Sequence, residues 1–324
     1  MTSGRTSSLV RIQTLLAFLT VYVCWGACFL LVQRSVATIP PMLTTSLRFL
    51  FASVLMFGLV RLGGKFQFTR VDVKDAAVQA LMLLVIGNGV TACVAEKIPS
   101  GYTGMLWATV PLWGVLLQMV WPGMSRPSAR VILSALIGFG GLSLLVEPWK
   151  VKADISQLVP TFVVLLGTLG WATGLFLGKS AKGKAEPMVA TALQMLLGGA
   201  MLLVLSFGRG ELTGFHFAQV TRSSWMALSA LVFVGGILPL SAYVWLTRRV
   251  TPTQLFTYAY VNPIVGILIG TVFAGEALSP NLTVGGAIIL FGVALSMTDK
   301  KAPEVLRAPE SPVLAPAAGT AAIG

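Results

Sequence analysis

Two tryptophans occupy matched places in separate apolar runs of this 324-residue chain, and they are the first candidates for a binding site. Trp25 precedes Pro41 by sixteen residues, and Trp171 precedes Pro187 by the same interval. An indole ring within an apolar helix can stack on a flat or apolar solute, and it can equally pack against a small neighbouring residue. Because the spacing recurs, we expect the two rings to belong to two copies of one structural unit.

A second group of candidates is polar and lies in the third apolar run. Asn88 and Thr91 share one helical face at i, i+3, and the flanking Gly87 and Gly89 allow another backbone to approach closely. A buried amide must find hydrogen-bonding partners. Two interpretations stay open, because the pair could form a hydrogen bond between helices or contact a bound solute.

The remaining candidates are aromatic or polar residues near the middle of later runs. Pro263 frees a backbone carbonyl one turn earlier, and the residues just before it form the most polar stretch of their run. The predicted substrate-binding residues are Trp25, Asn88, Thr91, Trp107, Trp171, Tyr243, Tyr258, Tyr260 and Asn262. Their chemistry is stacking and hydrogen bonding, which holds a solute without reacting with it.

Arg48 is the one basic residue inside an apolar run. A buried guanidinium in such a setting requires an anionic partner. Glu96, near the end of the third run, could supply a structural ion pair that braces two helices. Alternatively, Arg48 binds the carboxylate of an amino-acid-like solute.

Reactive groups are missing from the same runs, which excludes several kinds of chemistry. All eleven acidic residues and the single histidine fall in loops, tails or helix ends. The runs therefore offer no proton relay, no HExxH motif, no paired acidic motif and no Ser–His arrangement. The three cysteines have no loop partner, so neither a disulfide framework nor a zinc site is expected. We predict no catalytic residue, no metal and no cofactor.

Composition places these runs in a membrane. Hydrophobic residues make up 56% of the chain and charged residues only 10%, with a mean hydropathy of +0.85. A soluble protein of this size needs a charged surface that this composition cannot supply. The run lengths predict an all-α membrane protein with ten transmembrane helices. We place the spans at residues 12–32, 42–60, 76–95, 102–121, 131–146, 158–178, 188–207, 225–247, 253–274 and 282–298.

The ten spans divide into two repeats of five. Pro111 precedes Gly123 by twelve residues and Pro263 precedes Gly275 by twelve, so the proline blocks match as the tryptophan blocks do. Five is an odd number, so the second copy crosses the membrane in the opposite direction, which gives two inverted five-helix repeats. The predicted domains are a cytoplasmic tail, the two repeats and a disordered cytoplasmic tail, at residues 1–11, 12–146, 158–298 and 299–324.

The basic residues indicate the orientation of the chain. If the N-terminus is inside, sixteen Lys and Arg fall in cytoplasmic segments and six in outer segments, and Arg48 completes the 23. This bias predicts that both termini are cytoplasmic. The net charge of +12 is explained by these loops, so nucleic acid is not expected as a partner. The expected partners are a small-molecule substrate and the lipid bilayer, and a homodimer is compatible with the sequence.

The order and duplication of these elements resemble a known family over residues 12–298. The Trp25-Gly26 pair, the stretch from Pro41 to Arg48-Phe49 and the Gly275-Glu276 pair are similar to the EamA-type branch of the drug/metabolite transporter superfamily. The run Gly87-Asn88 through Ala95-Glu96 to Pro99-Ser100-Gly101 resembles its YedA-type bacterial permeases. One departure is that Gly123-Met124 stands where the second copy has Gly275-Glu276, so a paired role for this acid is not expected.

The resemblance implies two EamA repeats in a multi-pass bacterial inner-membrane protein, with a central cavity lined by spans one, three, four, six, eight and nine. We expect an exporter of small amphipathic metabolites, such as amino acids, aromatic metabolites or toxic compounds, that works by alternating access. Two alternatives come from other classes. A membrane-embedded lipid-modifying enzyme would need an acidic cluster that the sequence lacks, and a non-transporting scaffold would not need the repeat symmetry.

The charge bias predicts the result of single-cysteine labelling. A cysteine in the loop that contains Lys65 should not react with an impermeant reagent added from the periplasm, whereas one in the loop that contains Arg209 should react. The reverse pattern would contradict both the orientation and the direction of the repeats.

Overall fold

The computed structural model describes residues 3–62, 66–122, 126–146, 155–247, 249 and 258–297. The described segments form ten helical spans, which confirms the predicted all-α membrane fold. Those of the first repeat are α1 (Ser3–Val36), α2 (Pro41–Leu62), α3 (Arg70–Ala80) with the π-helix η1 (Leu81–Val90), α4 (Ser100–Trp107) with α5 (Val110–Val120), and α6 (Ala129–Val146). Those of the second are α7 (Ile155–Lys179), α8 (Pro187–Gly208), α9 (Arg222–Val232) with the π-helix η4 (Phe233–Ile237) and α10 (Leu238–Thr247), α12 (Tyr258–Ala274) and α13 (Pro280–Met297). Six of these are long and apolar enough to cross a membrane, and shorter apolar helices form the other four.

Helix boundaries follow local sequence signals. Pro41 and Pro187 open α2 and α8 as predicted, because proline fits the first helical turn, where its missing N–H costs nothing. Thr69 and Asp72 form a capping box at the start of α3. The helix α1 begins at Ser3, inside the segment predicted as a polar tail. The predicted C-terminal tail 299–324 lies outside the described residues.

Three spans are irregular near their middle. The third and eighth spans, which are equivalent in the two repeats, both contain a π-helical stretch, η1 and η4. The fourth span is divided between Trp107 and Val110, close to Pro111, which has no N–H to continue the helical ladder. Irregular backbone within a membrane span is tolerated where other protein groups bond the freed carbonyls, and it is frequent at functional sites.

Contacts between helices repeat when the two halves of the chain are exchanged. The equivalent helices α2 and α8, α6 and α13, and α4 and α12 pack on each other. The first span α1 packs on α10 of the eighth span and on α12 of the ninth, while α7 packs on η1 of the third span and on α4 and α5 of the fourth. This exchange is what a two-fold relation between inverted repeats produces.

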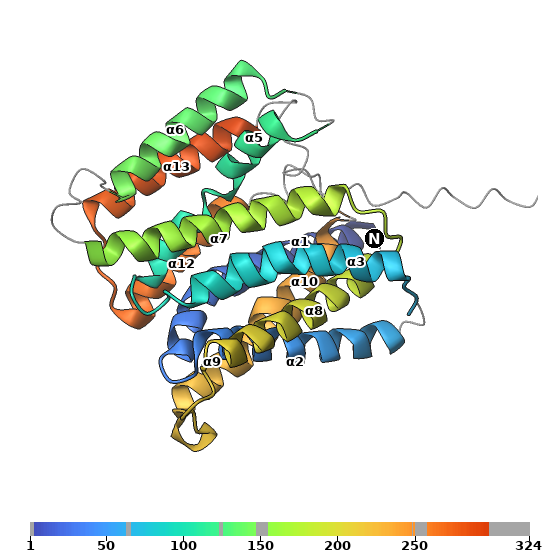
Figure 1. The fold of residues 1–324 in the computed structure, drawn as a ribbon. Coiled ribbons are helices and arrows are strands. Elements are labelled where there is room, and N and C mark those ends of the chain that lie inside the picture. Colours follow the sequence, from blue (N-terminus) through green and yellow to red (C-terminus); the bar gives the residue numbers. More distant parts are fainter. Residues whose placement is uncertain are drawn as a thin grey trace, which may run out of the picture.

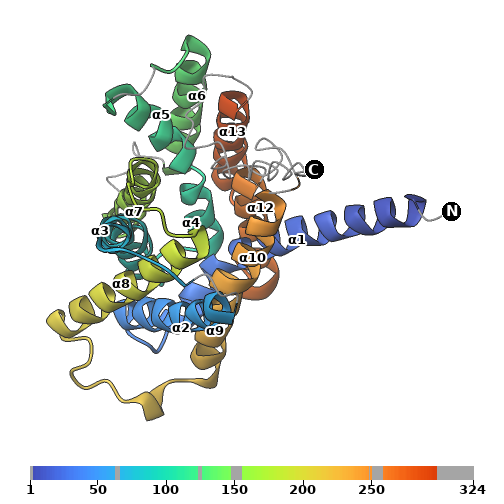
Figure 2. The same cartoon turned by 90° about the vertical axis from the view of Figure 1, so that its right-hand side faces the viewer.

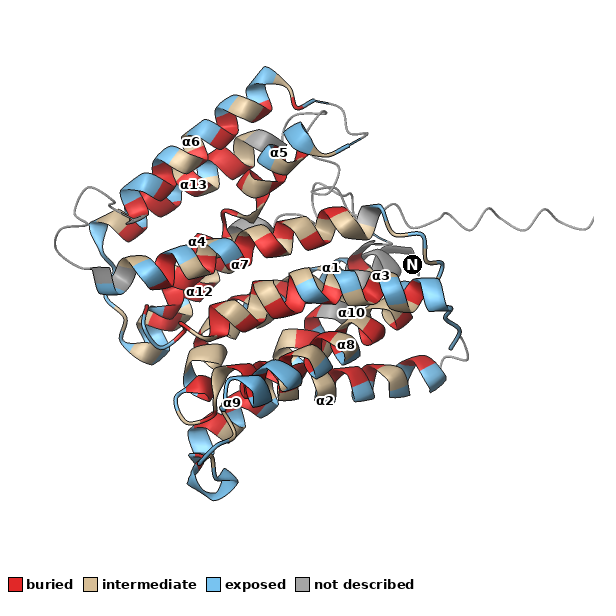
Figure 3. Cartoon of the chain, viewed as in Figure 1, coloured by how far each residue is buried: buried red, intermediate tan, exposed pale blue. Residues whose placement is uncertain are grey.

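The spans fall into a middle group and two flanking pairs. The pair α6 and α13 lies on one side and the pair α2 and α8 on the other, with α1, α3, α4, α7, α10 and α12 between them (Figures 1 and 2). Figure 3 shows buried positions facing the neighbouring helices and exposed positions facing outward. Many of the exposed side chains are large and apolar, for example Val54 of α2 and Phe291 of α13, as expected for faces that meet lipid.

Carboxylates bind the ends of α2 and α8 across the repeats. Glu211, which follows α8, accepts hydrogen bonds from the backbone N of Met42 at 3.3 Å and of Leu43 at 3.1 Å, at the start of α2. At the opposite end, Asp75 accepts bonds from the backbone N of Lys182 at 2.7 Å and of Gly183 at 2.8 Å, just before α8. Each set joins segments that the charge bias assigns to the same side of the membrane.

Glycines set the close approach of α6 and α13. A Cβ atom on Gly141 would lie 2.7 Å from the carbonyl oxygen of Gly285 and 2.8 Å from the backbone N of Ile289. The neighbouring Gly140 has open space around it, because a Cβ atom there would meet nothing within 4 Å. The two glycines therefore form a matched pair for a test of this contact.

We expect Gly141→Ala to lower stability by about 1–3 kcal/mol, because the added methyl group forces the two backbones apart. The control Gly140→Ala should be neutral or slightly stabilising, because it replaces glycine by a better helix former without a new contact. Thermal unfolding in detergent measures both changes. Equal losses in the two variants would contradict the packing described.

Candidate functional site

The predicted substrate-binding residues come from spans one, three, four, six, eight and nine, which form the middle group. Helix α1 carries Trp25, and α7 carries its equivalent Trp171. The other members come from η1 and the residue after it, and from α4, α10 and α12. The flanking pairs α2 with α8 and α6 with α13 contribute none of them.

Trp25, Tyr243 and Tyr258 form one aromatic group, where α1 packs against α10 and α12. The Trp25 ring centroid lies 5.0 Å from that of Tyr258, edge-on, and 5.7 Å from that of Tyr243, and the two tyrosine rings are 6.0 Å apart. All three rings are partly buried and surround the buried Val21. Tyr260 belongs to α12, but its side chain lies outside the described part of the chain.

Trp107 and Trp171 form a second aromatic group, between α4 and α7. Their rings meet edge to face with centroids 5.4 Å apart. The Trp171 ring lies over Gly87 of η1, where a Cβ atom would be 3.3 Å from Trp171 Cε3. Gly87 therefore permits the close approach that the sequence predicted for this stretch. The two equivalent tryptophans, Trp25 and Trp171, lie in different aromatic groups.

Phe29, which the sequence did not single out, links the second group to α1. Its ring centroid is 6.3 Å from that of Trp107. Phe29 packs against two glycines, because a Cβ atom on Gly104 of α4 or Gly266 of α12 would lie 3.1 or 3.3 Å from its ring. The signal was available, because Phe29 follows Trp25 by four residues and so shares its helical face.

Two polar atoms of this region have no partner. Trp107 Nε1 and Asn262 Oδ1 are buried without a hydrogen bond to any described residue. Trp107 lies one turn after Gly104, and Asn262 lies one turn before Gly266, so both flank the place where Phe29 packs. Buried polar atoms in native proteins are nearly always bonded, so an unpaired donor and an unpaired acceptor here require an explanation.

Asn88 and Thr91 bond within their own span. Asn88 Nδ2 donates to the Leu83 carbonyl at 3.0 Å, and Thr91 Oγ1 donates to the Gly87 carbonyl at 2.7 Å. These bonds replace the hydrogen bond between helices that was one of the two sequence interpretations, because carbonyls of the irregular η1 segment lie within reach. Contact of either residue with a solute stays a prediction.

Arg48 does not pair with Glu96, which corrects the ion pair considered from the sequence. Arg48 is buried and its Nη2 donates to the Gly235 carbonyl of η4 at 3.3 Å, whereas Glu96 is exposed in the turn before α4. Pro239 explains this choice, since it has no N–H to offer the carbonyl four residues earlier. The arginine thus bonds a carbonyl that lacks the donor a regular α-helix would provide, and a role in binding a solute carboxylate stays a prediction.

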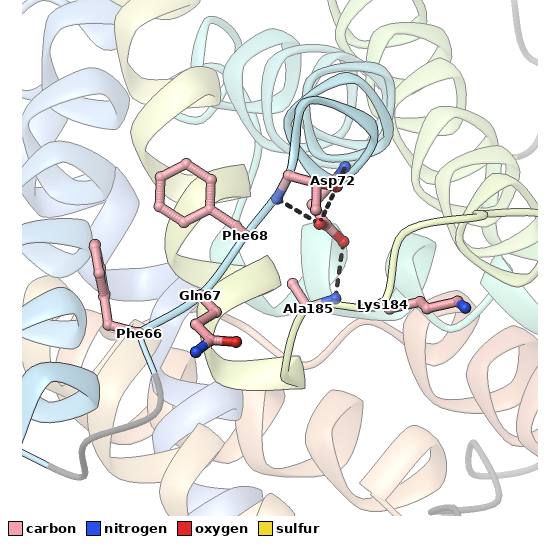
Figure 4. Close-up of a pocket in the computed structure, with 7 residues that line it drawn as sticks. Phe66, Gln67, Phe68, Asp72, Lys184 and Ala185 are labelled. Carbon is pink, nitrogen blue, oxygen red and sulfur yellow. Dashed lines mark hydrogen bonds between the residues drawn. The ribbon is translucent and has the colours of Figure 1, made fainter.

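Two hollows lie at the ends of the bundle. One, of about 510 Å³, lies between α1, the turn before α4 and the end of α12, and Glu96 lines it. The other, of about 550 Å³, lies at the opposite end and is lined by residues 66–69, Asp72, Lys184 and Ala185. The backbone N of Ala185 donates to Asp72 there (Figure 4). A common cavity for Trp25 and Trp171 stays a prediction. No group of three metal-binding side chains occurs within the described ranges.

Comparisons with known proteins show which proteins this chain resembles. A model of the EamA-like transporter family matches residues 12–147 and 159–298. The chain is 31% identical over 311 residues to the uncharacterized inner membrane transporter YedA of Escherichia coli (strain K12), covering 93% of this chain and 94% of the relative. It is 23% identical to the uncharacterized transporter YvbV of Bacillus subtilis (strain 168), over 90% and 93% of the two chains. A crystal structure with 18% identity has the same fold, with a TM-score of 0.58 over 88% of this chain and 96% of the other.

We expect Arg48 and Glu96 to act independently. Arg48→Ala should destabilise the protein by about 1–3 kcal/mol, because it leaves the Gly235 carbonyl unbonded, and Glu96→Ala should have an effect within about 0.5 kcal/mol. The double change should be additive within about 0.5 kcal/mol in thermal unfolding. A departure from additivity larger than this would support the Arg48–Glu96 ion pair. If Arg48→Ala folds normally and loses only carboxylate-bearing substrates, it binds the solute instead.

Proposed function

We propose that this chain, which belongs to the EamA-like transporter family, exports small amphipathic metabolites by alternating access. It is a multi-pass inner-membrane transporter of a small-molecule substrate, and not an enzyme. The family assignment removes the lipid-modifying enzyme and the scaffold that the sequence left as alternatives. The substrates we propose are amino acids, aromatic metabolites or toxic compounds with a flat apolar part.

The unpaired atoms Trp107 Nε1 and Asn262 Oδ1 carry this proposal. Leaving a buried polar group without a partner costs about 1–3 kcal/mol, so a solute that bonds both atoms recovers that cost. The rings of Trp171 and Phe29 lie beside that of Trp107 and can hold an aromatic or apolar body. One donor, one acceptor and several ring faces suit an amphipathic molecule, and they bind it loosely enough for release.

The architecture supports alternating access through the middle spans. Glu211, after α8, bonds the start of α2, and Asp75 of α3 bonds the segment before α8. The pair α6 and α13 is packed through glycines, so both flanking pairs suit a fixed frame. The middle spans hold the π-helical stretches η1 and η4 and the break between α4 and α5. These interruptions are the places where a span bends with the smallest loss of backbone bonds.

The proposal also includes the bounds of the repeats, the side of the termini, the direction of transport and a homodimer. The repeats extend over residues 12–146 and 158–298, which the two family matches support, and both termini are cytoplasmic, which the charge bias supports. Export rather than import is tested by measuring efflux of substrate from loaded cells. A homodimer through lipid-facing helices is tested by light scattering in detergent.

Trp107→Phe separates a solute contact from simple packing. Because it keeps an aromatic ring but removes the pyrrole part of the indole with its N–H, we expect the KM for a bound substrate to rise about fivefold, while stability falls less than for the same change at Trp113, which also loses a hydrogen bond. Counterflow with a panel of radiolabelled amino acids and aromatic metabolites measures this change.

Trp113→Phe is the matched control in the same span. Trp113 Nε1 donates to Thr168 Oγ1 at 2.9 Å, so its loss should lower stability and leave KM unchanged. If Trp107→Phe leaves the KM of every transported compound unchanged, the site assignment is wrong.

A further inference from the structure

Glu276 joins the outer ends of two spans that belong to different repeats. Its Oε1 accepts hydrogen bonds from the backbone N of Ser100 at 2.6 Å and from Ser100 Oγ at 2.8 Å, and its Oε2 accepts one from the backbone N of Gly101 at 2.9 Å. These donors form the first turn of α4, whose N–H groups have no partner within the helix. A carboxylate is favoured there by the free N–H groups and by the helix dipole.

The sequence around Glu276 fixes this carboxylate relative to α12. Gly275 ends α12 with φ of +66°, a conformation that glycine adopts without strain. The backbone N of Glu276 then donates to the Gly270 carbonyl at 3.2 Å. Gly101 allows α4 to lie directly against α12, since a Cβ atom on it would be 3.1 Å from Ile267 Cα. The outer ends of α4 and α12 are therefore held together.

The first span contributes to the same closure. Gln33 Nε2 donates to the Ile98 carbonyl at 3.3 Å, and Arg34 Nη2 donates to the Phe273 carbonyl at 3.2 Å. These two bonds connect α1 to the turn before α4 and to the end of α12. Of these five bonds, the three to Glu276 are the shortest and have a charged acceptor, so they contribute most to the closure.

We infer that Glu276 is a positioning residue that latches the outer gate of the transporter. The helix α4 has only eight residues, and it carries Trp107 at its other end. Because the span is broken before Pro111, α4 can move apart from α5, and the bond at its first turn sets both the closure and the place of Trp107. Solute leaves outward only after α4 separates from Glu276. This inference rests on the proposed function and orientation.

The position of the first repeat that is equivalent to Glu276 has no carboxylate in the sequence. The sequence register places Met124 opposite Glu276, and the whole segment 121–130 contains neither Asp nor Glu. Met124 itself lies outside the described residues. Helix α8 differs, because carboxylates act at both of its ends. Glu211 after α8 bonds the start of α2, and Asp75 of α3 bonds the segment before α8. The latch therefore biases the empty carrier toward a state closed to the outside, from which an exporter loads cytoplasmic solute.

Cysteine labelling tests the latch without any substrate, so its result is independent of the substrate we propose. Thr103 is buried one turn below Ser100, and Thr103→Cys reports on this gate in a background where Cys24, Cys28 and Cys93 are serine. An impermeant maleimide is added from the periplasmic side. We expect Glu276→Ala to raise the labelling rate at least about tenfold and Glu276→Gln to raise it less, because the amide keeps one acceptor oxygen.

Glu96→Gln is the control, because Glu96 lines the same hollow and is exposed. It should leave the labelling rate unchanged. Rates for both Glu276 variants equal to that of Glu96→Gln would overturn the latch, as would faster labelling only from the cytoplasmic side. Loss of folded protein in both Glu276 variants would also overturn it, because a contact required for folding does not open in every cycle.

Discussion

A backbone that crosses a membrane must bond every N–H and C=O group within the protein, and the structure depends on how this is done where helices are interrupted. Pro239 leaves the Gly235 carbonyl without its usual donor, and the Arg48 side chain of another span supplies one. At the helix ends, Glu211 and Glu276 bond the free N–H groups of α2 and α4. Arg48, Glu211 and Glu276 thus each bond backbone groups of another span, and Glu211 also lies 3.9 Å from Arg209 Nε.

The features that the sequence predicted correctly are those that depend on local patterns of residues. Apolar runs of bilayer length gave the ten spans, and the prolines at the first turns of α2 and α8 lie where the duplicated spacing put them. The partner of Arg48 was not predictable in this way. It depends on a carbonyl 187 positions away, freed by a proline whose effect is visible only after the spans are packed. The acceptor for Asn88 was not predictable either. Its Nδ2 donates to a carbonyl in a π-helical segment, and no local sequence pattern indicated that segment.

In the candidate site, too, the sequence predicted some features and not others. Equivalent positions in the repeats correctly indicated that Trp25 and Trp171 belong to the middle spans, but not that each ring would have different neighbours. Repeat symmetry relates backbones, whereas contacts depend on the side chains around them, and Tyr258 has no aromatic equivalent beside Trp171. Phe29 extends from α1 to Trp107 and partly closes the distance between the two groups.

The asymmetry at Glu276 also has a thermodynamic meaning. A carrier without coupled energy obeys detailed balance, so a bond that stabilises one conformation changes populations and rates but not the equilibrium distribution of solute. Glu276 in one repeat, where the sequence of the other repeat has methionine, therefore makes the two halves of a duplicated protein kinetically unequal. The bond between Glu276 and α4 determines which conformation of the empty carrier is more populated, and the solute gradient determines the direction of net flow.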